Sequence, residues 1–181
     1  MILYSNEYIS QLRELHARRD RPRGFGGKVK PLGLFHSYIK KWEPNTVLDY
    51  GCGKGTILEH NKKEYPKIQW EGYDPAVDAY MNIKKKKYDL VFCNDVLEHI
   101  EPEYVTNVLE HINSLAEKFI WLRIDTNPAR KTLLDGRNAH ISLNTSDWWK
   151  REIEILIPAR IEQITHHRGK LDIALIKKDI L

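Results

Sequence analysis

Apolar residues recur at helical spacing in two stretches near the start of the chain. Residues 5–19 carry them three to four positions apart, and this pattern predicts an amphipathic helix with Ser5 as its N-cap. The same periodicity from Leu32 to Trp42 predicts a second helix, which Pro44 ends. Between the two helices, residues 20–28 contain proline and several glycines and are predicted to form a mobile loop.

From residue 46 the pattern changes to short strands that alternate with helices. Residues 46–50 are apolar and β-branched and stop at a cluster of glycines, as a buried parallel strand does. A helix is predicted at residues 55–65, and another begins with Pro102 as its first residue. Further strands are predicted at residues 68–73, 88–93 and 118–124, and the later helix buries Tyr104, Val105, Val108, Leu109, Ile112 and Leu115.

The last part of the chain departs from this alternation. Residues 160–167 and 170–177 are strand-like runs on either side of Gly169, which predicts an antiparallel hairpin at the sheet edge. The whole pattern predicts an α/β protein with a doubly wound, mostly parallel sheet preceded by two helices. We expect one domain over residues 1–181, with helices and a lid in residues 1–43 and the core in residues 44–181.

Composition and charge narrow the class of protein. The formal net charge is only +4, which favours a solvated surface over a nucleic-acid footprint. No apolar run approaches the roughly 18 residues that cross a bilayer, so no membrane partner is expected. Cys52 and Cys93 are too few for a disulfide framework, which favours two reduced thiols in the cytoplasm over a disulfide between them.

The strongest motif lies where the first predicted strand meets the next helix. Gly51, Gly53 and Gly55 follow the strand at a spacing of two, and glycine allows a sharp turn and close approach to a ligand. A dinucleotide fingerprint needs its third glycine one position later, at Thr56. Asp49 also argues against a pyrophosphate, because its carboxylate repels phosphate and attracts an ammonium group.

Two further segments belong with the glycines. Asp74 ends the second predicted strand, 19 residues after Gly55, where a carboxylate can accept hydrogen bonds from both hydroxyls of a ribose. The alternative is an aspartate that caps a turn before Pro75. The third predicted strand runs into Asn94-Asp95-Val96-Leu97-Glu98-His99.

Together these segments resemble the class I S-adenosylmethionine-dependent methyltransferases. The resemblance covers residues 46–124 well, and the terminal hairpin is similar to the reversed last strands of that family. It implies a Rossmann-like core with seven strands in the order 3-2-1-4-5-7-6. Tyr88 follows Asp74 by only 14 positions, so the family's third strand is expected to be shortened or absent.

The resemblance also implies the cofactor and its site. S-adenosylmethionine, which becomes S-adenosylhomocysteine, is expected above the carboxyl ends of the first, second and fourth strands of the family order. The residues implied to hold it are Asp49, Tyr50, Gly51, Cys52, Gly53, Asp74, Pro75, Asn94, Asp95 and Val96.

A long segment without clear periodicity, residues 125–146, is expected to bind the methyl acceptor. We assign Arg137, Asn138 and Trp148 to the acceptor, because guanidinium and indole groups suit an anionic or planar molecule. An equal alternative is that Trp148 or its neighbour Trp149 only anchors this loop to the core. Both lie on a helix whose expected N-cap is Ser146.

His99 and His140 are the candidate catalytic bases, with structural roles as the alternative for each. No metal ligands are assigned. A divalent-metal site built from Asp95, Glu98 and His99, with His140 as a fourth ligand, is kept as a weaker hypothesis, because the two carboxylates share a face if this segment is helical.

The methyl acceptor is not specified by any of these motifs. We favour a small, anionic or sugar-like molecule over two alternatives. A nucleic-acid acceptor is suggested by the arginine-rich residues 18–30, and it predicts affinity that falls steeply with salt. A protein that binds the cofactor without transferring its methyl group is the other alternative, and the oligomeric state is left open.

Overall fold

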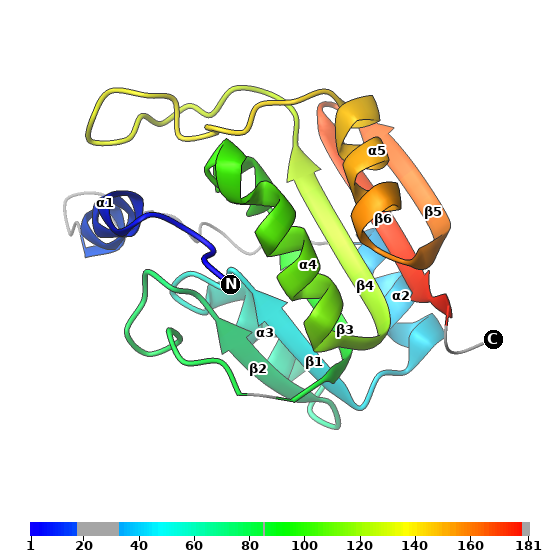
Figure 1. Ribbon diagram of the computed structural model, residues 1–181. Helices are drawn as coiled ribbons and strands as arrows, with labels where there is room; N and C mark the ends of the chain where they lie inside the picture. The colour runs from blue at the N-terminus through cyan, green and yellow to red at the C-terminus, as the bar shows by residue number, and fades with distance from the viewer. Residues whose placement is uncertain (18–32, 85, 179–181) are drawn as a thin grey trace.

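A computed structural model describes residues 1–17, 33–84 and 86–178. Its centre is a sheet of six strands in the order β2-β1-β3-β4-β6-β5, in which β6 runs antiparallel to the other five (Figure 1). The C-terminal antiparallel hairpin expected from the sequence is therefore confirmed. The strands are β1 (Thr46–Tyr50), β2 (Gln69–Tyr73), β3 (Tyr88–Asn94), β4 (Ala116–Asp125), β5 (Ala159–His167) and β6 (Lys170–Lys177).

The number of strands corrects the expectation of seven. The described residues between Asp74 and Tyr88 form turns and bends, and β2 follows directly on β1 in the sheet order. A parallel neighbour for β2 requires a crossover of about a dozen residues in addition to the strand itself. This segment is too short for both, so the family's third strand is absent from the described chain.

Helices cover both faces of the sheet. The helices are α1 (Asn6–Ala17), α2 (Gly33–Trp42), α3 (Thr56–Glu64), α4 (Val105–Leu115) and α5 (Ser146–Leu156), with short 3-10 turns at Leu97–His99 and Pro102–Tyr104. Helices α4 and α5 lie over one face, and α2 and α3 lie over the other (Figure 1).

Each face has its own apolar core. On the α4 side, Leu109 and Ile112 pack with Val91 and Leu122 of the central strands. On the α2 side, an aromatic cluster joins the helix to the sheet: the ring centres of Phe35 and Phe92 are 4.1 Å apart. Because both faces of the sheet are buried in this way, the central parts of β1, β3 and β4 are apolar without alternation.

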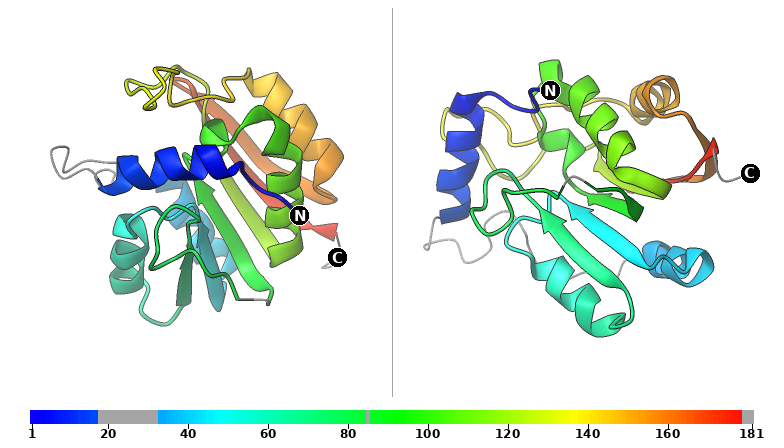
Figure 2. Two further views of the ribbon diagram at one scale, coloured as in Figure 1. Left: turned by 60° about the vertical axis from the view of Figure 1, so that its left-hand side comes forward. Right: turned by 60° about the horizontal axis from the view of Figure 1, so that its bottom comes forward.

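Helix α1 lies apart from these two layers, beside the carboxyl ends of β1 and β2 (Figure 2). Ser5 caps it as expected, because its Oγ accepts a hydrogen bond from the N–H of Tyr8 at 3.1 Å. The carboxylate of Glu101 accepts bonds from the N–H and the Oγ–H of Ser5, at 2.8 and 2.6 Å. These contacts attach α1 to the segment after β3. The predicted loop at residues 20–28, and with it most of the proposed lid, lies outside the described residues.

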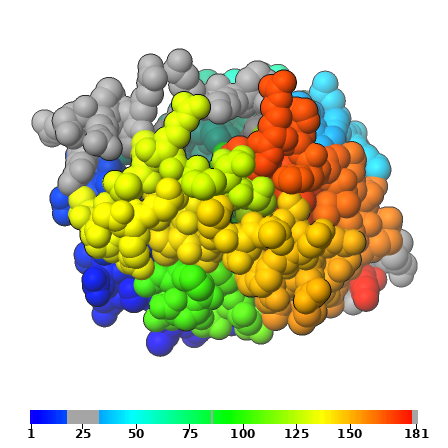
Figure 3. Space-filling model, turned by 90° about the horizontal axis from the view of Figure 1, so that it is seen from above, coloured from blue at the N-terminus to red at the C-terminus, as the bar shows by residue number. Residues whose placement is uncertain are grey.

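The segment between β4 and α5, residues 126–145, spreads over the top of the molecule beside α1 (Figure 3). Leu133 and Ala139 of this segment form a small core with Tyr8 of α1. At its end the N-cap of α5 is Thr145, whose side chain accepts from the N–H of Trp148, and Ser146 is the first helical residue. The expectation of Ser146 as the cap was therefore wrong by one position.

In the part of the chain that the structure describes, no helix is both long and apolar enough to cross a bilayer. Cys52 and Cys93 are buried and free, so the expectation of two thiols rather than a disulfide is confirmed. The assignment of residues 1–181 to one domain stays a prediction.

Candidate functional site

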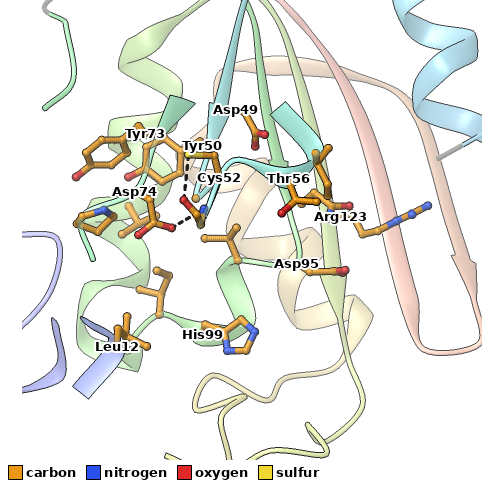
Figure 4. A pocket seen from close by; sticks show the side chains of 18 of the residues that line it. Leu12, Asp49, Tyr50, Cys52, Thr56, Tyr73, Asp74, Asp95, His99 and Arg123 are labelled. Carbon is orange, nitrogen blue, oxygen red and sulfur yellow. Dashed lines mark hydrogen bonds between the residues drawn. The ribbon is translucent and has the colours of Figure 1, made fainter. Parts of the chain in front are cut away.

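A cavity of about 570 Å³ opens at the carboxyl ends of the parallel strands, within the range of about 300–1,000 Å³ that is typical of small-molecule sites. All ten residues assigned to the cofactor from the sequence line it: Asp49, Tyr50, Gly51, Cys52, Gly53, Asp74, Pro75, Asn94, Asp95 and Val96. Figure 4 shows Asp49, Asp74 and His99 around this one space. The strand order brings these residues together, since β2, β1 and β3 are neighbours that end at the same edge.

The turn after β1 depends on a glycine that no other residue can replace without strain. Gly51 has φ of +78°, and an added Cβ would come within 2.4 Å of Cγ2 of Val96. Both the backbone angle and the contact exclude a side chain there. The turn is thus pressed against the start of the segment that follows β3.

Asp49 is a buried carboxylate that lacks a complete set of partners. It is 3% exposed, and its Oδ2 has no hydrogen-bond partner among the residues that the structure describes. Burial, followed by repulsion from Asp74, raises its pKa to about 7. A cationic ligand group beside Oδ2 would supply the missing partner and favour the ionised form.

Asp74 joins the glycine turn to the end of β2. Its two carboxylate oxygens accept hydrogen bonds from the N–H groups of Gly53 and Ala76, each at 2.9 Å. Figure 4 shows the Asp74 side chain in the pocket. A carboxylate offers about four acceptor positions, so these two bonds leave capacity for the hydroxyls of a ligand. Asp74 therefore has a structural role, as the alternative proposed, and remains able to bind a ribose.

The opposite wall of the cavity comes from elements that the sequence motifs did not point to. Arg123 at the end of β4 forms a two-pronged ion pair with Asp172 of β6, and Lys170 bridges Asp95 and Asp125 at 2.9 and 2.7 Å. The predicted strand order could have identified these residues, because a reversed strand beside β4 starts at the edge of the sheet where β4 ends. The residues missed in this way or through the packing of α1 are Leu3, Tyr4, Leu12, His16, Arg123, His167, Arg168, Lys170 and Asp172.

The two candidate bases lie next to each other, but only one faces the cavity. His99 lines the cavity, and its Nδ1 is 2.7 Å from the carbonyl oxygen of Ala139. The ring of His140 stands nearly perpendicular to it, with 4.7 Å between ring centres. Burial and the neighbouring His140 lower the pKa of His99, which keeps the imidazole neutral but makes it a weaker base.

The three residues assigned to the acceptor are not among those that line the cavity. Arg137 is exposed and ion-paired with Asp135. Asn138 bonds with its amide to both backbone groups of Ala129 and so shapes the loop. Trp148 is half-buried and packs edge-on against Trp149, which is fully buried in the core.

Comparison with known proteins agrees with this arrangement. The family described as a methyltransferase domain matches residues 8–154, most of the chain, and the chain belongs to that family. The resemblance drawn from the glycine turn and the strand ends is confirmed. A search of curated proteins finds no match.

Solved structures with the same fold include methyltransferases of several kinds. An O-methyltransferase family protein from Burkholderia thailandensis is 15% identical with a TM-score of 0.61, over 81% of this chain and 53% of that one. Magnesium protoporphyrin IX methyltransferase from Synechocystis PCC 6803, solved with bound S-adenosylmethionine, is 19% identical with a TM-score of 0.60, over 96% and 99% of the two chains. The mitomycin 7-O-methyltransferase MmcR is 10% identical with a TM-score of 0.57, over 94% and 54%. This chain thus spans about half the length of the first and third relatives.

Proposed function

We propose that the chain binds S-adenosylmethionine in this cavity and transfers its methyl group to a small, anionic or sugar-like acceptor. The observation that carries the cofactor is the unpartnered Oδ2 of Asp49 beside the turn at Gly51, with Asp74 at the end of the adjacent strand. An ammonium group at Asp49 and ribose hydroxyls at Asp74 match the methionine and ribose portions of that cofactor. The bound cofactor supplies a methyl group on a positively charged sulfur, which an acceptor atom displaces directly.

The protein's own contribution to such a reaction is alignment and exclusion of water. Leu12 and His16 of α1 line the cavity, so the helix restricts access to it. His99 faces the same space and can orient an acceptor through its ring nitrogen. A strong base is needed only for an acceptor whose proton has a high pKa.

A small acceptor is supported by the compact chain and by two structural relatives, a magnesium protoporphyrin IX methyltransferase and a mitomycin 7-O-methyltransferase. The arginine-rich segment that motivates a nucleic-acid acceptor, residues 18–30, lies outside the described residues. Two buried free thiols support the cytoplasm as the compartment.

Calorimetry with S-adenosylmethionine tests the cofactor site. Asp74→Ala is expected to weaken binding by on the order of 1.5–3 kcal/mol, because charged hydrogen bonds to the ribose are lost. Asp78→Ala, an exposed aspartate four residues later, serves as the matched control and is expected to bind as the wild type does. Equal affinities of the two variants would remove Asp74 from the cofactor site.

Mass spectrometry of a cell extract incubated with isotopically labelled cofactor tests the acceptor. A labelled small molecule is the expected result. Label in RNA or DNA, together with binding that weakens steeply with salt, would favour the nucleic-acid alternative. Tight cofactor binding without any labelled product would favour the non-catalytic alternative.

A further inference from the structure

Three side chains next to the cavity have ligand atoms that converge on one point. Glu98 and His99 come from the 3-10 turn after β3, and His140 comes from the loop that follows β4. One ligand atom from each lies within 4.8 Å of the other two. A hydrogen bond from the N–H of Ser142 to the carbonyl of Glu98 ties the two segments together at this point, at 3.1 Å.

Glu98 is the residue whose surroundings call for a ligand. Its side chain is 0% exposed. Oε1 accepts from the N–H of Asp125 at 3.0 Å, whereas Oε2 has no hydrogen-bond partner within residues 1–17, 33–84 and 86–178. A buried carboxylate oxygen without a partner destabilises a fold unless a cation or a donor reaches it.

The two histidines are oriented in the way that metal-binding histidines are. Nδ1 of His99 lies 2.7 Å from the carbonyl of Ala139, and Nδ1 of His140 lies 2.5 Å from the carbonyl of Asn127. A carbonyl only accepts, so each Nδ1 carries the proton and each Nε2 carries the lone pair. Hydrogen bonds of this kind fix the tautomer and the ring orientation of metal ligands.

We propose that Glu98, His99 and His140 together bind one divalent transition-metal ion, such as zinc, at the wall of the cavity. Two imidazole nitrogens and a carboxylate oxygen are a ligand set that zinc and its neighbours favour. Ligand atoms roughly 2.1 Å from one ion are at most about 4.2 Å apart, so the three groups need only a small contraction to close around it. Asp95, expected from the sequence to be a ligand, is instead held by Lys170 and lies outside this group.

The position of this site gives it a role in the reaction. Because His99 lines the cavity, a three-ligand ion beside it keeps an open coordination position on the acceptor side. A hydroxyl or carboxylate of the acceptor bound there is held in place, and a hydroxyl proton is made more acidic. This role rests on the proposed methyl transfer, whereas binding of the ion does not.

Metal binding by the full-length chain tests the proposal. Protein stripped with a chelator is dialysed against zinc and, separately, cobalt(II), and the bound ion is counted by elemental analysis. We expect one ion per chain and a visible absorption spectrum from cobalt bound to nitrogen and oxygen ligands. His140→Ala and Glu98→Gln are each expected to weaken binding at least tenfold, whereas His60→Ala, an exposed histidine on α3, is expected to leave it unchanged.

The controls keep the outcomes separate. Glu98→Gln retains the oxygen that accepts from Asp125, and if that variant fails to fold, the partly exposed His140 carries the test alone. Absence of a bound ion in the wild type, or equal affinity in His140→Ala and His60→Ala, would overturn the proposal. Calorimetry with S-adenosylmethionine on the stripped protein reports on the cofactor site independently: cofactor binding without metal binding overturns only this inference.

Discussion

Asp49 combines burial, an unpartnered oxygen and a position at the end of the central strand. The sequence placed it correctly at the cavity because the glycine turn is local: a strand, three glycines and a helix follow each other without any long-range contact. The same holds for Asp74 and for residues 94–96, each at a strand end. Lys170 and Arg123 were not found this way, since their place at the cavity follows from the position of β6 in the sheet and from no motif of their own.

The raised pKa of Asp49 leads to a pH-dependent prediction. A carboxyl group whose folded pKa of about 7 exceeds the ordinary 3.8 holds its proton more tightly in the folded state. Its contribution therefore lowers the free energy of unfolding as pH rises from about 4 to about 7. Asp49→Asn removes this loss. The free energy of unfolding of the cofactor-free variant, relative to that of the wild type, is therefore expected to increase by on the order of 2 kcal/mol when the pH is raised from 5 to 7.5.

Urea unfolding of both proteins at the two pH values measures the difference. The same variant is expected to bind S-adenosylmethionine more weakly at pH 7.5, because an amide cannot pair with an ammonium group. A stability difference that does not change with pH would show that Asp49 is ionised in the folded, cofactor-free protein.

At the scale of elements, the loop of residues 126–145 contacts both α1 and the C-terminal hairpin. It shares a small core with α1, its Thr126 N–H donates to the carbonyl of Gly169 in the C-terminal hairpin at 2.8 Å, and it supplies His140. The sequence predicted a long functional segment here, but not its path, because that path is set by contacts with α1 and the hairpin rather than by its own periodicity. The role of Arg137, Asn138 and Trp148 at the acceptor stays a prediction.

Arg137→Ala tests whether this loop acts on the acceptor and not on the cofactor. Arg137 lies outside the cavity lining and pairs with Asp135, which in turn accepts from Gln11 of α1 at 3.0 Å. The variant is expected to lower turnover while the affinity for S-adenosylmethionine stays within about twofold. Steady-state kinetics and calorimetry measure the two quantities, with Arg151→Ala on the exposed side of α5 as the control. Equal losses in both quantities would contradict the separation.

At the scale of the whole molecule, the alternation of strands and helices was predictable because apolar period and glycine punctuation change sharply at residue 46. The number of strands was not, since the segment after Asp74 is short enough to cast doubt on a seventh strand and too irregular to exclude it by pattern alone. The aromatic cluster under α2 could not be predicted from the sequence either, because it joins residues from four separate elements.

Phe35→Ala tests the contribution of that cluster to stability. Phe35 is 0% exposed and contacts the rings of Phe92 and Trp121, so its removal leaves a cavity between α2 and the sheet. We expect a loss of about 3–5 kcal/mol in the free energy of unfolding, measured by denaturant titration. Ile155→Ala, at a side chain that is 69% exposed, is expected to stay within about 0.5 kcal/mol of the wild type. A small effect at Phe35 would mean that α2 repacks.

Because β6 runs antiparallel to the other strands, the two walls of the cavity come from different parts of the chain. The parallel strands bring their last residues to it, whereas β6 brings its first ones, Lys170 and Asp172, directly after the turn at Gly169. Changes of length or sequence in that short turn alter one wall without disturbing the glycine turn on the other. Within this architecture, selectivity for new acceptors can therefore diversify at the C-terminal hairpin while the machinery for the shared cofactor is inherited intact.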